Sequence, residues 1–144
     1  MFKNIVVAFI TKQFENKSFL VGLTIAQKFD GNITVVDCVY KKPSKFIFFE
    51  TGTDKKSYAK TKEKILKNLE KFEKIAKEKD ILIKTKVALT DSISDWIVDF
   101  VKEKKCDLLI IDHPHLTEFE NDHYEFIIKS ITASVKVPIL LLRS

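Results

Sequence analysis

All three histidines of this 144-residue chain fall within residues 112–123, a stretch that also carries several carboxylates. Imidazole and carboxylate groups at this density could coordinate Zn²⁺ or another divalent ion. The spacing of His113, His115 and His123 matches no dedicated site, such as two histidines one helical turn apart with a glutamate between them. Short histidine-rich tracts are compositional features that also suit an exposed polar loop. We therefore predict a mobile, metal-free loop, with a metal or small-ligand sensor as an alternative function.

Nucleophilic catalysis has weaker support, because it needs a histidine or another base beside the attacking hydroxyl. The serines that could serve fall at expected helix caps or helix faces, with no histidine placed beside them: Ser92, Ser94, Ser130 and Ser134. The chain is therefore predicted not to be an enzyme.

A nucleotide phosphate site on a fold of alternating strands and helices favours glycines, which let backbone N–H groups approach the phosphates at a helix N-terminus. The three glycines, Gly22, Gly31 and Gly52, fall inside an expected helix, in a turn and in a long loop. The stretch after the expected fourth strand instead carries carboxylates, which repel phosphate. We expect no ATP binding and no cofactor.

Apolar runs of strand length alternate with amphipathic stretches of helical period along the whole chain. Strands are predicted at 3–10, 33–40, 81–89, 107–111 and 139–142, and helices at 13–29, 55–79, 93–101 and 124–135. Ser92 and Asp95 have the spacing of a capping box at the start of the third helix. Near-continuous apolar strands separated by helices predict an α/β fold: a single-domain, open five-stranded parallel sheet with helices on both faces, Rossmann-like, over residues 1–144.

Ligands of such open sheets bind outside the carboxyl ends of the strands, where the strand order reverses. The loops after the first and fourth strands are the expected walls of this crevice. The candidate crevice residues are Ile10, Thr11, Cys38, Asp112, His113, His115, Glu125 and Phe126.

Composition excludes several classes of partner. The chain has 25 basic and 20 acidic residues and a net charge of +5, but Arg143 is its only arginine and the lysines alternate with glutamates. Such alternation is typical of solvated helix faces and disfavours nucleic-acid binding.

The chain has no apolar run of eighteen residues and no signal-peptide layout at its N-terminus, so we expect no membrane association and a cytoplasmic location. Cys38 and Cys106 are expected to be reduced and buried.

Two apolar segments stand outside this pattern. Phe46 to Phe49 lie in an expected loop and could form a lid over the crevice, a surface for an unknown protein partner, or a segment tucked under the second helix. Ile139 to Leu142 end the chain without a polar gatekeeper before Arg143. An unprotected edge strand of this kind predicts a homodimer through the C-terminal strand.

The chain resembles the universal stress protein family over essentially its whole length. The similar segments are Phe2 to Ala8, Gly31 to Val36, Val87 to Phe100, Cys106 to Ile111, Leu116 to Glu120 and Val137 to Arg143. This resemblance implies a cytoplasmic, dimeric stress-response module that binds or regulates and does not catalyse.

Members of that family that bind ATP carry an Asp after the first strand and a motif of Gly, two residues, Gly, nine residues, Gly, then Ser or Thr. Aligned without gaps, the motif falls on Asp112, His115, Glu125 and Phe126, the family's Asp falls on Ile10, and the Gly at the end of its third strand falls on Thr90. The chain therefore resembles the branch of the family that does not bind ATP. A nucleotide binder with a degenerate phosphate loop is the other alternative.

Overall fold

The computed structural model describes residues 1–12, 15–41 and 52–143 of the chain. Strands and helices alternate strictly within these residues: β1 (Asn4–Phe9), α1 (Lys17–Phe29), β2 (Asn32–Tyr40), α2 (Gly52–Glu78), β3 (Ile83–Thr90), α3 (Ile93–Glu103), β4 (Leu108–His113), α4 (Glu118–Ser134) and β5 (Ile139–Arg143). The predicted α/β alternation is therefore confirmed, with boundaries shifted by a few residues. Phe46 to Phe49 lie outside the described residues.

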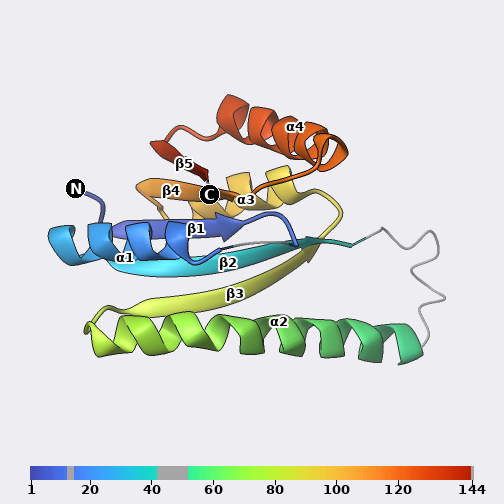
Figure 1. Cartoon of the computed structure of the whole chain (residues 1–144), viewed down its shortest axis with the longest axis horizontal. Coiled ribbons are helices and arrows are strands. Elements are labelled where there is room, and N and C mark those ends of the chain that lie inside the picture. Colours follow the sequence, from blue (N-terminus) through green and yellow to red (C-terminus); the bar gives the residue numbers. More distant parts are fainter. Residues whose placement is uncertain (13–14, 42–51, 144) are drawn as a thin grey trace.

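The five strands form one parallel sheet with the order β3-β2-β1-β4-β5 (Figure 1). β1 lies at its centre, where Ile5 pairs with Ile33 of β2 on one side and with Leu108 of β4 on the other. The chain runs outward from β1 through β2 to β3, then crosses back to β4. The strand order therefore reverses between β1 and β4, as the predicted open sheet requires.

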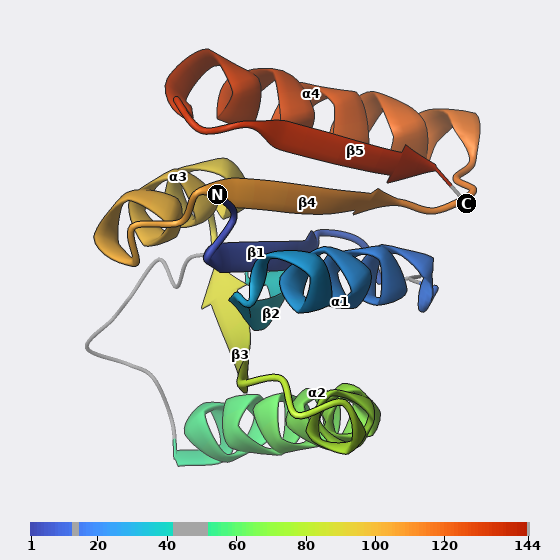
Figure 2. The same cartoon turned by 90° about the vertical axis from the view of Figure 1, so that its left-hand side faces the viewer.

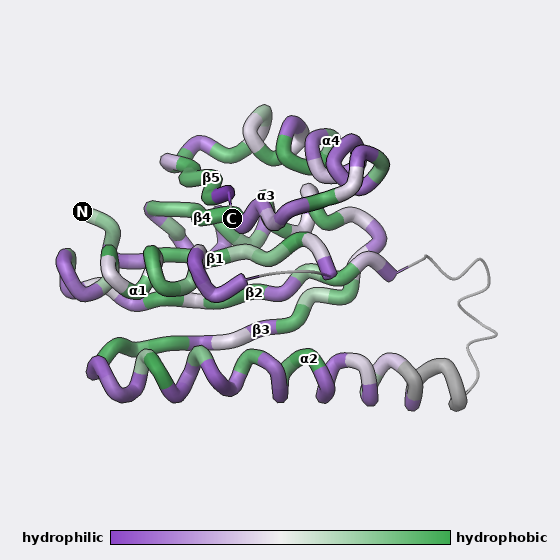
Figure 3. Tube along the Cα trace, viewed as in Figure 1, coloured by the Kyte–Doolittle hydropathy of each residue, from purple (hydrophilic) through white to green (hydrophobic). Residues whose placement is uncertain are grey.

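Each face of the sheet is covered by two helices, so the core has two layers (Figure 2). Alternate residues of β1 point to opposite faces. Ile5, Val7 and Phe9 pack with α1 and α2, whereas Val6 and Ala8 pack with α3 and α4. Because β1 and β4 are buried on both faces, their sequences are almost continuously apolar, which is visible in the hydropathy colouring (Figure 3).

α2 is a 27-residue helix that buries one narrow stripe against the sheet and exposes lysine and glutamate elsewhere. Leu69, Phe72 and Ala76 form the fully buried part of that stripe. The ring of Phe72 lies 5.8 Å from that of Phe9 in β1 and 4.4 Å from that of Phe19 in α1. This aromatic contact joins both helices of one layer to the central strand.

The predicted capping box at Ser92 and Asp95 is wrong. Ser92 is the N-cap residue of α3, but its side chain makes no capping hydrogen bond. The backbone N–H of Ser92 donates instead to Oγ1 of Thr90 at 3.1 Å. Asp95 has one methylene fewer than the Glu or Gln that normally completes a capping box. A capping box does form at α4, between Thr117 and Glu120.

The predicted irregular loop over residues 112–123 is also wrong in its extent. Asp112 and His113 belong to β4, and α4 already begins at Glu118, so His123 lies in a helix. The capping box explains the early start of α4, because it fixes the helix N-terminus at Thr117. Only residues 114–117 connect strand and helix.

Both cysteines are free and buried, as predicted. No helix among the described residues has the length and apolarity that crossing a membrane requires.

Gly22 allows α1 to lie close to the sheet. A Cβ at this position would come within 2.8 Å of Cγ2 of Val7, 3.1 Å of Cδ1 of Ile33 and 3.3 Å of Cδ1 of Ile110. These neighbours are buried side chains of β1, β2 and β4 with little room to move.

We expect Gly22→Ala to lower the free energy of unfolding by about 1 to 2 kcal/mol, because overpacking outweighs the better helix propensity of alanine. Thr24→Ala, at an exposed position of the same helix, is the control and should change stability by less than about 0.5 kcal/mol. Urea denaturation of the two variants checks this. A Gly22→Ala variant as stable as the wild type would show that α1 can move away from the sheet without cost.

Candidate functional site

A cavity of about 620 Å³ lies at the carboxyl ends of β1 and β2, beside the point where the strand order reverses. Every helix except α1 contributes to its walls. The lining residues are Ile10, Thr11, Lys12, Asp37, Cys38, Val39, Tyr40, Thr61, Ile65, Asn68, Ile93, Leu116, Phe119, Glu120, His123, Tyr124 and Ile127. We call this cavity the crevice.

The walls of the crevice are mainly apolar on both sides of the sheet. Ile10 and Cys38 are buried on the α3 and α4 side, where Ile93 and Ile127 also pack. Phe119 stands at the start of α4 and is 85% exposed. Tyr40, at the end of β2, also lines the crevice and is 57% exposed. A mainly apolar cavity with exposed aromatic side chains suits a small organic ligand better than a bare inorganic ion.

Asp37 is the buried charged residue of the crevice. Its β2 position pairs with Phe9 of β1 and with Val87 of β3, and only 6% of the residue is exposed. Among the described residues no hydrogen-bond partner is found for its carboxyl group. Burial therefore raises the pKa of Asp37 from 3.8 to about 6.

Asp37 was not among the sequence candidates. It lies within the apolar run of residues 33–40, which predicts a buried strand. A single carboxylate within an otherwise apolar strand was the available signal, because an acidic residue is rarely fully buried without a partner.

The crevice gathers only part of the predicted set. Ile10, Thr11 and Cys38 line it, together with His123. Asp112, His113, Glu125 and Phe126 are absent from its lining, and His115 lines a neighbouring hollow.

Asp112 lies beneath the N-terminal end of α1. It is 2% exposed, and Oδ1 accepts a hydrogen bond from the Ser18 hydroxyl at 2.5 Å. Oδ2 has no partner within the described residues. Burial raises the pKa of Asp112, while the Ser18 hydroxyl and the backbone N–H of Glu15 act in the opposite direction. Asp112 thus joins β4 to α1, on the far side of β1 from β2.

The three histidines take part in separate contacts. The ring of His113 stacks on Tyr124 with 4.1 Å between centroids, and its Nε2 lies 3.1 Å from Oδ1 of Asn121. His115 and His123 belong to different hollows. Within the described part of the chain, no three histidine, cysteine or acidic side chains gather closely enough to hold a metal ion.

Glu125 and Phe126 lie in the interior of α4, where backbone N–H groups serve the helix itself. Nδ2 of Asn121 donates to Oε1 of Glu125 at 3.1 Å, and Phe126 is exposed to solvent. Neither residue presents a backbone donor to the crevice.

The N-terminus of α4 is capped by the chain's own side chains. The N–H of Glu120 donates to Oγ1 of Thr117 at 3.3 Å, and the N–H of Asn121 donates to the Thr117 carbonyl at 2.8 Å. Oε1 of Glu120 accepts from the Thr117 hydroxyl at 2.7 Å and from its N–H at 3.2 Å. The Thr117 contacts hold the pKa of Glu120 below its usual value, so a negative charge already stands at this helix end.

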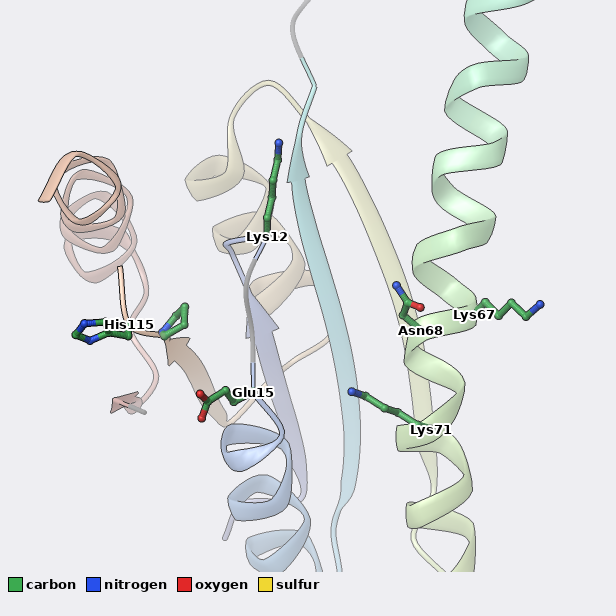
Figure 4. A pocket seen from close by; sticks show the side chains of 7 residues that line it. Lys12, Glu15, Lys67, Asn68, Lys71 and His115 are labelled. Carbon is green, nitrogen blue, oxygen red and sulfur yellow. The ribbon is translucent and has the colours of Figure 1, made fainter. Parts of the chain in front are cut away.

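A shallower hollow of about 750 Å³ adjoins the crevice and shares Lys12 and Asn68 with it. Its other lining residues are Glu15, Lys67, Lys71, Pro114 and His115. The basic groups do not converge on one point (Figure 4). Lys71 points from α2 toward the strands, whereas Lys67 points away from them. The hollow therefore has positive charge without a formed phosphate cradle.

The raised pKa of Asp37 has a consequence for stability. The folded protein binds the Asp37 proton more tightly than the unfolded chain does, so this group's stabilising contribution is complete below pH 3.8 and is lost as pH rises through about 6. Ionised Asp37 therefore destabilises the protein at neutral pH.

We compare the free energy of unfolding of Asp37→Asn with that of the wild type. This difference should shift in favour of the variant by about 2 kcal/mol when the pH is raised from 4 to 7.5. Urea denaturation of both proteins at the two pH values measures this difference. Asp95→Asn, which changes an exposed carboxylate of α3, is the control and should show almost no such pH dependence. An Asp37→Asn difference that is the same at both pH values would contradict the buried, unpartnered carboxyl.

Solved structures with the same fold include three universal stress proteins. One from Burkholderia pseudomallei superposes with a TM-score of 0.69 at 10% identity, covering 99% of this chain and 97% of its own. UspA from Lactobacillus plantarum gives 0.67 at 14% identity, with 99% and 98% covered. A protein from Archaeoglobus fulgidus in complex with dAMP gives 0.61 at 12% identity, with 98% of each chain covered.

No curated protein matches the sequence. The family model described as "Universal stress protein family" matches residues 1–143. Together with the strand order, the two-layer core and the crevice at the strand reversal, this match settles the assignment that the sequence resemblance implied. The chain belongs to the universal stress protein family.

Proposed function

We propose that this protein is a non-catalytic, cytoplasmic stress-response module that binds small ligands or partners and does not bind ATP. The observation that carries the proposal is the closed N-terminus of α4. In a phosphate site at a helix N-terminus, backbone N–H groups point at the anion. Here the Thr117 side chain takes the N–H of Glu120, and the Glu120 carboxylate takes the N–H of Thr117 and places a negative charge at this helix end.

The position of α4 supports the same conclusion. Glu125 and Phe126, which align with the last Gly and the Ser or Thr of the family's ATP motif, lie in the interior of that helix. Their N–H groups are committed to helical hydrogen bonds, and Glu125 adds negative charge. Ile10 also offers no polar group where ATP-binding members have an Asp.

The absence of a catalytic constellation among the described residues supports a binding role. Ser18, the buried serine, donates to Asp112 and has no histidine among its hydrogen-bond partners. The rival function is nucleotide binding, which the dAMP complex of the Archaeoglobus fulgidus protein shows for that relative.

The homodimer belongs to the same proposal. β5 is an edge strand, and Leu141 on it is 43% exposed. The opposite edge, β3, carries exposed Lys84 and Lys86, which protect it from pairing with another strand. The apolar edge is therefore the one suited to antiparallel pairing with a second copy.

We predict that MgATP gives no saturable heat in calorimetric titration up to millimolar nucleotide. Each lost contact costs roughly 1.4 kcal/mol, or a factor of ten, so several together take a micromolar site beyond the millimolar range. The same preparation should release no phosphate from ATP above the buffer rate. A micromolar dissociation constant, or nucleotide retained through purification, would support the rival function instead.

We predict a dimer at micromolar concentration in sedimentation equilibrium. Leu141→Lys should shift the protein to monomer, because it places a charge on the pairing edge. Leu82→Lys is the matched control, since Leu82 is an exposed leucine before β3, and it should remain dimeric. A monomeric wild type, or two variants that behave alike, would count against dimerisation through β5.

A further inference from the structure

Asp37 is the feature of the crevice that the proposed function leaves unexplained. Asp37 is 6% exposed, its carboxyl group makes no hydrogen bond among the described residues, and it lines a cavity large enough for a small organic molecule. An uncompensated carboxyl in an apolar strand costs folding free energy. Such a cost is typical of groups that are kept for binding or catalysis.

The second carboxylate of the crevice is in a different state. Glu120 is held by the hydroxyl and the N–H of Thr117 and contributes to the helix cap. Asp37 therefore has an open acceptor, whereas Glu120 supplies additional negative charge at the mouth.

The remaining walls set the shape of a matching ligand. Ile65 of α2 and Ile93 of α3 lie on opposite sides of the crevice, and Phe119 stands at its opening. Asn68 points from α2 toward the strands (Figure 4) and makes no hydrogen bond with Asp37. The walls suit a compact apolar body, and the buried acceptor suits a strong hydrogen-bond donor.

We propose that the crevice binds a small organic cation, a protonated primary amine on a compact apolar body, with its ammonium group against the Asp37 carboxylate. A charged hydrogen bond to a largely buried carboxylate is stronger than a neutral one. The ligand would also relieve the destabilisation that ionised Asp37 imposes on the empty protein. This inference rests on the proposed function, because it treats the crevice as the ligand site of a binding module.

Lys12 is the internal competitor for this role, since its ammonium group also belongs to the lining. In Figure 4 its side chain extends along the carboxyl ends of the strands, away from Glu15. Lys12 lies after β1 and does not lower the pKa of Asp37, which burial alone raises. The carboxylate therefore remains available to a ligand.

The test uses three compounds with the same phenyl ring and two-carbon linker but different charge: phenethylamine, 2-phenylethanol and 3-phenylpropionate. We expect phenethylamine to bind the full-length protein at pH 7.5 at least about tenfold more tightly than the other two in calorimetric titration. Equal binding of all three would show an apolar pocket without charge selection. Tighter binding of the carboxylate would show that Lys12 dominates. Either result, or no phenethylamine binding at about 10 mM, overturns the inference.

Variants assign the effect to one side chain. Asp37→Asn keeps the shape and should weaken phenethylamine binding about tenfold while leaving 2-phenylethanol unchanged. Asp95→Asn removes an exposed carboxylate outside the crevice and should leave both affinities unchanged. Unchanged phenethylamine affinity in a folded Asp37→Asn protein would also overturn the inference.

The pH dependence gives an independent readout. Phenethylamine binding should weaken between pH 7.5 and pH 5 as Asp37 becomes protonated. The charged or titratable groups that line the same crevice are Lys12, Cys38, Tyr40, Glu120, His123 and Tyr124, whereas the lining residues of α2, Thr61, Ile65 and Asn68, are uncharged. Because histidine also changes charge in this range, His123→Gln is the control. The pH dependence of phenethylamine binding should persist in His123→Gln and disappear in Asp37→Asn. The reverse pattern would assign the pH dependence to His123 and overturn the inference.

This experiment separates the inference from the proposed function. Binding of MgATP would overturn the proposed function whatever the amine does. If neither phenethylamine nor MgATP binds, only the assignment of a cationic ligand is overturned.

Discussion

The placement of β1 between β2 and β4 is the constraint on which the rest of the structure depends. β1 is buried on both faces, and its pairing with the next strand, β2, on one side and with the distant β4 on the other makes the strand order reverse beside it. The reversal directs the connections after β1 and β4 away from each other at one end of the sheet. The crevice occupies this end, so its location follows from topology before any side chain is considered.

Side chains then decide what this end of the sheet can bind. In this chain Thr117 and Glu120 cap the first turn of α4, and the carboxyl group of Asp37 lines the crevice without a hydrogen bond among the described residues. Both features place carboxylates where a phosphate cradle would present N–H groups, although the chain belongs to the universal stress protein family. A fold match at 10 to 14% identity consequently defines the scaffold and leaves the ligand to local chemistry.

The fold could be predicted from the sequence because β1, β2 and β4 are largely apolar runs and the helices have an amphipathic period. The segment after β4 was harder to predict. His113, His115 and His123 suggested one polar loop, but strand, connection and helix divide them, because a capping box starts α4 early. The crevice was only partly predictable: Ile10 and Cys38 follow from strand ends, whereas Asp37 was hidden within an apolar run. A strand residue lines a cavity only if its side chain points there and the covering helix, here α2, leaves space above it. Neither condition can be derived from residue spacing alone.

The central pairing also has a consequence for synthesis on the ribosome. β1 and β2 lie close in sequence and can pair as soon as both have emerged, but the β4 partner of Ile5 is Leu108, near the end of the chain. During the intervening seconds of translation, one long edge of an almost wholly apolar strand lacks its neighbour. A nascent chain stalled before β4 would therefore expose an aggregation-prone edge, which makes the middle of this small domain the interval in which protection by a chaperone matters most.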